Sequence, residues 1–556
     1  MTRRLLVAAF VGVLCATTGA QAPPPDLILS NGKIITVDER FSIAQAIAIK
    51  GERIVAVGSN QEITRLAGPG TRRIDLKGRS VTPGLIDNHM HLLRAGINWQ
   101  QEVRWDGVGS RRQALEMLRA RGKAAAPGAW VYNLGGWAIE QFGDDSKPFT
   151  RDELDQVVPD HPVFLQASYR EAYLNSRALQ AMAIDDKTPA AAWVVRDAAG
   201  RATGRILEAG FRQMVNKIPE PSPAEVEAST RVMIRDLNKA GLTAFGSSGC
   251  EDDLLATYRR WADLGQLNVR VFCITSPGGA GTPQQVDQLL PKIPQWKLFQ
   301  GDHYIDHVLW GEGLYGAGLA DPMFVPTSNP QPDQLAQWRR VAMEIAKAGI
   351  PIHVHANLTN TLDAFLDQIE AVDKVHPIRN LRWEMAHANQ LNPSQLARMK
   401  KLGMYAAVHP WAVINGGINQ EVYGDAAYDM APLRTIQNSG IMWGLGSDGS
   451  RANQILPFAT LSWAVTGKMV GGRQVLRASE TISREDALIA HTRKNSYFVF
   501  RENDIGSIQP GKLADLVVLD RDYLTVPADQ IKDITSVMTV VGGRIAYDAG
   551  AATSTR

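Results

Sequence analysis

The strongest structural signal in the 556-residue chain is the stretch Pro83-Gly84-Leu85-Ile86-Asp87-Asn88-His89-Met90-His91. A Pro-Gly turn followed by a short apolar run is typical of the start of a buried strand. His89 and His91 are two positions apart, so their side chains project from the same face of that strand. Both imidazoles can therefore reach one cation. A His-x-His pair alone is a weak signal, but its place after a turn and an apolar run favours a metal site.

Downstream, the chain alternates short apolar runs with helical patterns, which is typical of βαβ units around a parallel sheet. Runs such as Ile350-Pro351-Ile352 suit strands that are buried on both faces. The clearest strand-then-helix units begin at Leu242, Val269, Ile350, Leu381, Met404 and Ile441. We therefore predict an α/β fold in which residues 83–500 form a (β/α)8 TIM-type barrel. The less regular stretch at about 100–240 is predicted to be an insertion that includes a segment covering the substrate.

Both ends of the chain are patterned as short β-strands separated by turns. Asn31-Gly32 interrupts the apolar runs near the start, and Gly542-Gly543 does the same near the end. We predict that residues 21–82 and 501–556 together form one small β-sandwich domain, which the barrel interrupts.

The first twenty residues predict a secretory signal peptide, 1–20. Arg3 and Arg4 give a positive start, and the apolar run from Leu5 ends in small residues at Ala20. An uncleaved membrane anchor is the alternative, although the run is short for a spanning helix. The prediction is a mature protein in the periplasm or the medium, with no membrane association after cleavage.

Composition favours a soluble globular protein. The chain is 45% hydrophobic and 21% charged, with a net charge of +2 and no basic run. A nucleic-acid partner therefore has no electrostatic support, and a small-molecule substrate is expected. The oligomeric state cannot be predicted.

Only two cysteines, Cys250 and Cys273, follow the predicted cleavage site. So few cysteines do not make a disulfide framework, and we expect two buried thiols. One bridge between them is the first alternative, and a thiolate metal ligand at Cys250 is the second.

Three further metal-binding side chains are expected at the ends of other barrel strands, where barrel enzymes place their chemistry. His355 ends the run His353-Val354-His355, and we expect His353 to face the barrel interior. His387 follows another apolar run, and Asp448 follows Gly446-Ser447. Four imidazoles and one carboxylate suit a divalent ion such as zinc. The predicted metal ligands are His89, His91, His355, His387 and Asp448.

Beyond this constellation, the sequence resembles the amidohydrolase superfamily, and within it the family-3 group of N-substituted formamide deformylase-like enzymes. The resemblance implies that His89, His91, His355 and Asp448 hold ligand positions and that His387 is the histidine of the sixth strand. The matching stretches are Pro83 to His91, Gly136-Trp137, Thr150 to Asp155, Asn175 to Leu179, Gly446-Ser447-Asp448 and Gly506 to Leu516.

Departures from the family pattern bear on the number of metal ions. The family carries a lysine on the fourth strand that bridges two ions once it is carboxylated, and Val308 stands in its place. Gly246-Ser247 replaces a usual His-Asp, and Tyr169-Arg170 replaces a usual Gly-His. We therefore expect one metal ion per chain rather than two, with His307 or Glu312 as the alternative replacement for the lysine.

The predicted reaction is hydrolysis of a non-peptide amide C–N bond by metal-activated water. Asp448 would move the proton as general base and then general acid. His387 would orient the water or stabilise the oxyanion. The alternatives are an aminohydrolase of the deaminase type, a cyclic-amide hydrolase, and a ligand-binding barrel that has lost catalysis.

Four side chains are candidates for contact with the substrate: Trp137, Tyr169, Arg170 and His409. Aromatic packing would explain Trp137 and Tyr169 as well, and a polar core position would explain His409.

Overall fold

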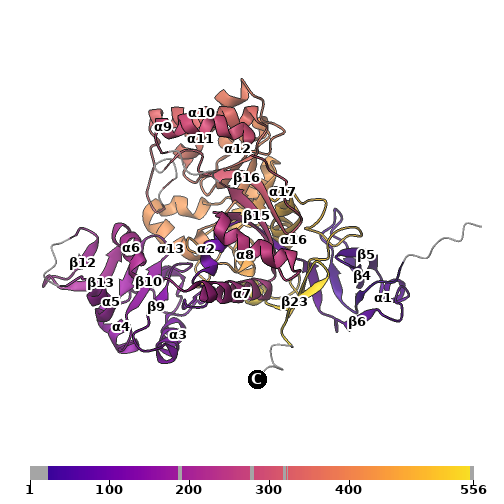
Figure 1. The fold of residues 1–556 in the computed structure, drawn as a ribbon, viewed down its shortest axis with the longest axis horizontal. Coiled ribbons are helices and arrows are strands. Elements are labelled where there is room, and N and C mark those ends of the chain that lie inside the picture. Colours follow the sequence, from indigo (N-terminus) through magenta and orange to yellow (C-terminus); the bar gives the residue numbers. More distant parts are fainter. Residues whose placement is uncertain (1–22, 186–190, 276–280, 317–320, 322, 551–556) are drawn as a thin grey trace, which may run out of the picture.

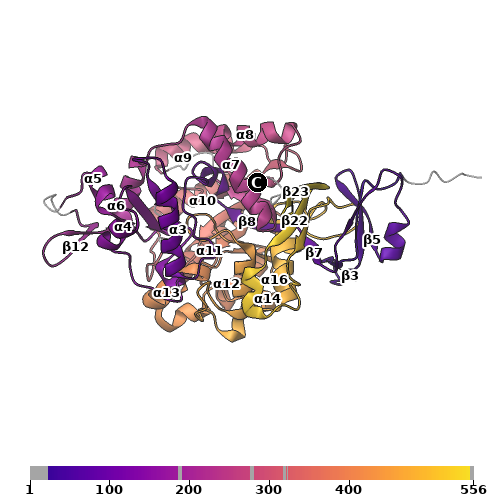
Figure 2. The ribbon, with the colours of Figure 1, turned by 90° about the horizontal axis from the view of Figure 1, so that it is seen from below.

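The computed structural model describes residues 23–185, 191–275, 281–316, 321 and 323–550, so the predicted signal peptide lies outside the described residues. Three parts follow one another along the long axis of the molecule (Figures 1 and 2). A small sheet from the N-terminal segment lies at one end, the barrel occupies the middle, and the insertion lies at the other end.

Eight parallel strands form the barrel and pair in chain order, which confirms the predicted fold class. A backbone bridge between Met90 and Gly449 joins the first strand to the segment that follows the last strand. Asn495 strengthens this seam, because its amide nitrogen donates to the carbonyls of Ile86 at 2.5 Å and Leu445 at 2.8 Å. The strands are β8 (Leu85–Met90), β14 (Leu242–Ser248), β15 (Arg270–Thr275), β16 (Ile305–Glu312), β17 (Ile352–Ala356), β18 (Glu384–His387), β19 (Tyr405–Val408) and β20 (Trp443–Leu445).

Helix α7 (Pro223–Lys239) illustrates how the sequence builds the outer layer. Ser222 and Glu225 form a reciprocal capping box, and Pro223 occupies the first turn, where its missing N–H costs nothing. Met233, Ile234 and Leu237 follow a helical spacing and are buried. Burial of each such side chain contributes about 1.5–3 kcal/mol. Other outer helices are α8 (Asp252–Asp263), α10 (Pro332–Lys347), α11 (Thr359–Asp373), α12 (Pro393–Leu402), α14 (Leu433–Ser439) and α15 (Pro457–Thr466).

The insertion has a sheet of its own, in the order β12-β13-β11-β10-β9. Its strands are β9 (Val131–Asn133), β10 (Val163–Ala167), β11 (Glu171–Leu174), β12 (Val194–Arg196) and β13 (Ala202–Leu207). Helices α3 (Arg111–Ala124), α4 (Arg151–Val157), α5 (Ser176–Ala181) and α6 (Glu208–Met214) accompany the sheet. The predicted insertion is therefore a folded layer beside the barrel (Figure 1).

The two chain ends meet in one six-stranded sheet, β23-β22-β21-β7-β2-β3. Strand β7 (Ser80–Pro83) pairs antiparallel with β21 (Leu516–Leu519), so the sandwich joins both ends, as predicted. The other strands of this sheet are β2 (Lys33–Ile35), β3 (Ile43–Ala44), β22 (Ser536–Val541) and β23 (Arg544–Asp548). A second sheet holds β1 (Leu27–Ser30), β4 (Ala46–Lys50), β5 (Arg53–Gly58) and β6 (Arg72–Asp75).

One buried ion pair ties the sandwich to the barrel. Arg270 of β15 donates two hydrogen bonds, of 2.7 and 2.8 Å, to the carboxylate of Asp515 beside β21. The two side chains are 0% and 4% exposed. In the described part of the chain, none of the helices has the length and apolar character needed to cross a membrane.

Candidate metal centre

The end of β8 and the segment after β20 are joined through their backbones, and this places two predicted ligands beside Asp448. The amide of Asp448 donates to the carbonyl of His89 at 3.1 Å, and the amide of His91 donates to that of Gly449 at 2.6 Å. Asp87 adds a carboxylate that accepts from the amides of His89 and Ser447, both at 3.1 Å. The first and last strands thus deliver their side chains to the same side of the barrel mouth.

The predicted ligands converge on one place. Oδ1 of Asp448 lies 3.4 Å from Nε2 of His89 and 3.2 Å from Nε2 of His91. The ligand atoms of His89, His91 and Asp448 all lie within 4.8 Å of one another, which is close enough to hold one ion. His89, Glu312 and His387 form a second group at the same spacing.

Glu312, the last residue of β16, lies at the centre of the cluster. Its Oε2 is 2.9 Å from Nδ1 of His355 and 3.2 Å from Nε2 of His387. Its Oε1 is 3.7 Å from Nε2 of His91 and accepts from the hydroxyl of Ser248 at 3.3 Å. A carboxylate therefore lies between the ligands of the first strand and those of the fifth and sixth strands.

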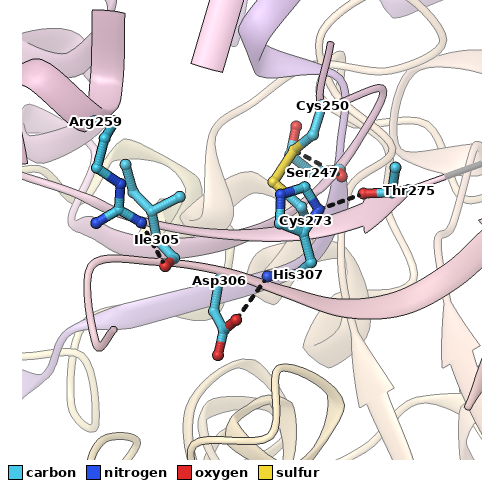
Figure 3. Close-up of a disulfide and its surroundings, with 8 residues drawn as sticks. All are labelled: Ser247, Cys250, Arg259, Cys273, Thr275, Ile305, Asp306 and His307. Atoms are coloured by element: carbon cyan, nitrogen blue, oxygen red, sulfur yellow. Dashed lines mark hydrogen bonds between the residues drawn. A yellow bond between two sulfur atoms is a disulfide. The ribbon is translucent and has the colours of Figure 1, made fainter. Parts of the chain in front are cut away.

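The same strand explains why Val308 does not matter to this cluster. Val308 is fully buried in the barrel core with Ile86 and Phe272. The pairing register of β16 shifts between His307 and Leu309, so strict alternation does not connect Val308 to Glu312. The contacts of Glu312 with His355 and His387 place its carboxylate in the cluster. His307 points to the opposite side, where its Nδ1 lies 2.9 Å from the hydroxyl of Thr275 (Figure 3).

The donor set fits a divalent cation. His89 is 0% exposed, and neither of its ring nitrogens has a hydrogen-bond partner in the structure. Burying an imidazole without a hydrogen-bond partner costs free energy. A metal ion that binds the lone pair of the ring nitrogen removes this cost. Burial alone would raise the pKa of Asp448 and of Glu312, but the surrounding histidines hold both pKa values well below the usual range. Both carboxylates are therefore anionic at neutral pH, as metal ligands must be.

A further layer of side chains fixes the orientation of the cluster. The indole N–H of Trp411 donates to Oδ2 of Asp448 at 2.8 Å. His353 stacks on His89, with ring centroids 4.8 Å apart, and bonds to Glu384 inside the barrel, as expected. Asp448 has a φ of 62°, in the left-handed region that is sparsely populated for such residues and often seen at functional sites.

A small cavity of about 270 Å³ lies over the cluster. Tyr169 from the insertion lines it, together with Glu208 and Arg212 from helix α6. Residues of the insertion thus form part of the cavity lining. The remaining lining residues outside the cluster are Arg94, Asp321, Met323, Trp411 and Ala452.

Three of the four predicted substrate contacts do not line this cavity. Trp137 is 0% exposed and packs among aromatic rings in the core of the insertion, with Trp105 at a centroid distance of 4.7 Å. Arg170 pairs with Glu140 and Glu421 and is not among the residues that line the cavity.

His409 is the third, and its place follows from two hydrogen bonds. It is 0% exposed; its Nδ1 accepts from the amide of His387 at 3.1 Å and its Nε2 donates to Oδ1 of Asn88 at 2.8 Å. It therefore positions His387 rather than facing a substrate. Of the four candidates, only Tyr169 lies at the cavity.

The expectation of two free thiols is wrong, because Cys250 and Cys273 form a disulfide (Figure 3). Ser247 of β14 pairs with Cys273 of β15, and the chain after β14 turns so that Cys250 reaches back to the neighbouring strand. Their Cα atoms are 5.8 Å apart, a normal separation for a bridge. The bonded sulfur also excludes Cys250 as a thiolate metal ligand.

A parallel (β/α)8 barrel with histidine and carboxylate side chains gathered at its mouth defines the class of metal-dependent barrel hydrolases. The model of the amidohydrolase family matches residues 72–547, and the chain belongs to that family. It is thus an enzyme of the group that acts on carbon–nitrogen bonds other than peptide bonds.

Individual relatives are distant but cover nearly the whole chain. The N-substituted formamide deformylase of Arthrobacter pascens is 26% identical over 94% of this chain and 98% of its own length. An uncharacterised metal-dependent hydrolase from Pyrococcus furiosus has the same fold, with a TM-score of 0.61 and 23% identity over 90% of this chain and 100% of its own. An adenosine deaminase from Xanthomonas campestris with bound zinc shares the fold at 15% identity and a TM-score of 0.53, over 96% and 97%.

Proposed function

We propose that the chain hydrolyses the C–N bond of a small non-peptide amide with the help of a divalent ion, zinc being the first candidate. The observation that carries the proposal is the convergence of His89, His91, Asp448 and Glu312 beneath a cavity of about 270 Å³. Nitrogen and carboxylate ligands of this kind suit zinc. The formamide deformylase among the relatives supports an amide as substrate.

The number of ions depends on Glu312. The expectation of a single ion came from Val308, because two cations repel each other unless an anion lies between them. Glu312 supplies such an anion between His91 on one side and His355 and His387 on the other. We therefore propose a site for two ions, with His89, His91 and Asp448 on one side of Glu312.

When bound, the ion would lower the pKa of a water molecule toward 7 and polarise the amide carbonyl. The residues of the chain transfer the proton and hold the reacting groups in position. Asp448 accepts the proton of the water and passes it to the leaving nitrogen, and the hydrogen bond from Trp411 keeps its carboxylate in place. Tyr169 and Met323 enclose the cavity and limit the size of the substrate.

The test combines elemental analysis of the dialysed protein with a panel of formamides, other amides and lactams. We expect two equivalents of metal in the wild type and about one in Glu312→Ala, together with release of an organic amine. One equivalent in the wild type would restore the single-ion expectation. Ammonia release or ring opening without an organic amine would favour the aminohydrolase or cyclic-amide alternative, and no turnover at all would favour a ligand-binding barrel.

We further propose that residues 1–20 direct export and that the mature chain begins near Gln21. The disulfide between Cys250 and Cys273 supports this, because structural disulfides persist in oxidising compartments. Fractionation with N-terminal sequencing of the soluble periplasmic protein is the test. A full-length species confined to the membrane would contradict it.

A further inference from the structure

One arginine at the cavity, Arg94, carries a charge that no ion pair within the described residues neutralises. Arg94 follows His91 by three residues, lies in the short helix α2 (Leu92–Gly96) and lines the cavity. Its Nε is buried without any hydrogen-bond partner.

The surroundings of Arg94 make this lack of a partner unusual. Its one side-chain hydrogen bond goes to the hydroxyl of Tyr169, at 2.9 Å, so most of its donors remain unused. The nearby Arg212 is different, because Glu208 accepts from it at 2.8 and 3.0 Å while its guanidinium lies 5.1 Å from the centre of the Tyr169 ring. Arg212 is thus neutralised inside the protein and Arg94 is not.

A cation with unused donors beside the cavity suits an anionic ligand. The fork of donors on the guanidinium of Arg94 matches a carboxylate.

We propose that Arg94 forms a carboxylate-binding subsite next to the metal centre, so that the substrate is an amide that also carries a free carboxylate. The phenol of Tyr169 lies beside this subsite and fixes the orientation of Arg94. The inference rests on the proposed amide hydrolysis for its kinetic consequence but not for the binding of the carboxylate itself.

Matched pairs of substrates test the subsite. N-formylvaline and N-isobutylformamide differ only in a carboxylate on the amine side, and N-methylsuccinamate and N-methylpropanamide differ only in one on the acyl side. We expect one of the charged members to have the higher kcat/KM. Arg94→Ala should lower that value on the order of 10- to 100-fold, mostly through KM, since a hydrogen bond to a charged group contributes about 1.5–3 kcal/mol. The neutral partner should change little.

Arg170→Ala is the matched control, because its guanidinium is already paired with Glu140 and Glu421 and lies outside the cavity. It should keep the preference for the charged substrate. Equal loss of activity toward charged and neutral substrates in Arg94→Ala would overturn the proposal, because Arg94 would then act on the reaction rather than on the carboxylate. A wild type that prefers neither charged member would overturn it as well.

A binding measurement separates this inference from the proposed function. Calorimetric titration with 3-methylbutanoate should give binding that weakens in Arg94→Ala but not in Arg170→Ala, whereas 3-methylbutan-1-ol should bind equally to all three proteins. If no amide is hydrolysed but this pattern holds, the proposed function fails and the subsite stands. If amides are hydrolysed and 3-methylbutanoate binds Arg94→Ala as tightly as the wild type, the subsite fails alone.

Discussion

Replacing Asp448 with asparagine should abolish most turnover while leaving the fold intact. Asparagine has the same size and keeps one oxygen, which can still accept the 2.8 Å hydrogen bond from Trp411. It cannot accept a proton near neutral pH. Loss of a general acid–base group commonly lowers the rate on the order of 10²–10⁴-fold. We expect a fall of kcat in that range with little change in the thermal midpoint.

A second buried carboxylate provides the matched control. Asp515 accepts two hydrogen bonds, of 2.7 and 2.8 Å, from the buried Arg270, and neither residue lines the cavity. Asp515→Asn leaves that arginine with an uncompensated charge, and breaking a buried pair in this way costs about 3–5 kcal/mol. The same chemical change should therefore lower stability at position 515 and activity at position 448.

The assay compares kcat, metal content and thermal midpoint for both variants on any substrate that the panel identifies. His89, His91 and Glu312 remain in Asp448→Asn, so most of the metal should remain as well. Near-normal kcat with full metal content would refute the proton-transfer role of Asp448. If metal content and activity fall together, Asp448 is needed to bind the metal, and the loss of activity then reports the loss of metal.

Three more outcomes follow from the packing and the cluster. His91→Ala should lose metal and activity together, because His91 belongs to one of the two ligand groups; elemental analysis showing full metal content would contradict this. Replacing Cys250 and Cys273 with serine should lower the free energy of unfolding by about 3 kcal/mol, and an unchanged urea midpoint would argue against the bridge. Trp137→Ala should cost about 3–5 kcal/mol of stability with unchanged KM, whereas a raised KM at unchanged stability would revive its assignment to the substrate.

The barrel and its predicted ligands could be derived from the sequence because each rests on local patterns. Apolar runs marked the strands, and a histidine or aspartate after each run marked the strand end that faces the mouth. Parallel strands in a closed barrel bring their carboxyl ends together, so residues as far apart as His89 and Asp448 need no further information to meet. Their roles as ligands remain predictions until metal is measured.

Glu312 shows what the family pattern alone could not decide. The comparison with the usual lysine drew attention to Val308 and left Glu312, four residues later on the same strand, as an alternative. Neither the length of β16 nor its shift of register near Val308 was visible in the sequence. Only pairing of Glu312 with Val354 of β17 shows that the strand continues far enough to bring this carboxylate to the mouth.

Substrate contacts could not be predicted, because they depend on which charges find partners inside the protein. Arg170 stood out in the sequence since it replaces a family residue, yet Glu140 and Glu421 neutralise it away from the cavity. Arg94 attracted no attention, although it lies three residues from His91. An arginine is available to a substrate only when the fold leaves its charge unpaired, and that property belongs to the tertiary arrangement of carboxylates rather than to any motif. The proposed preference for a carboxylate therefore rests on an Arg94 that has no ion pair among the described residues, a property that no local pattern encodes.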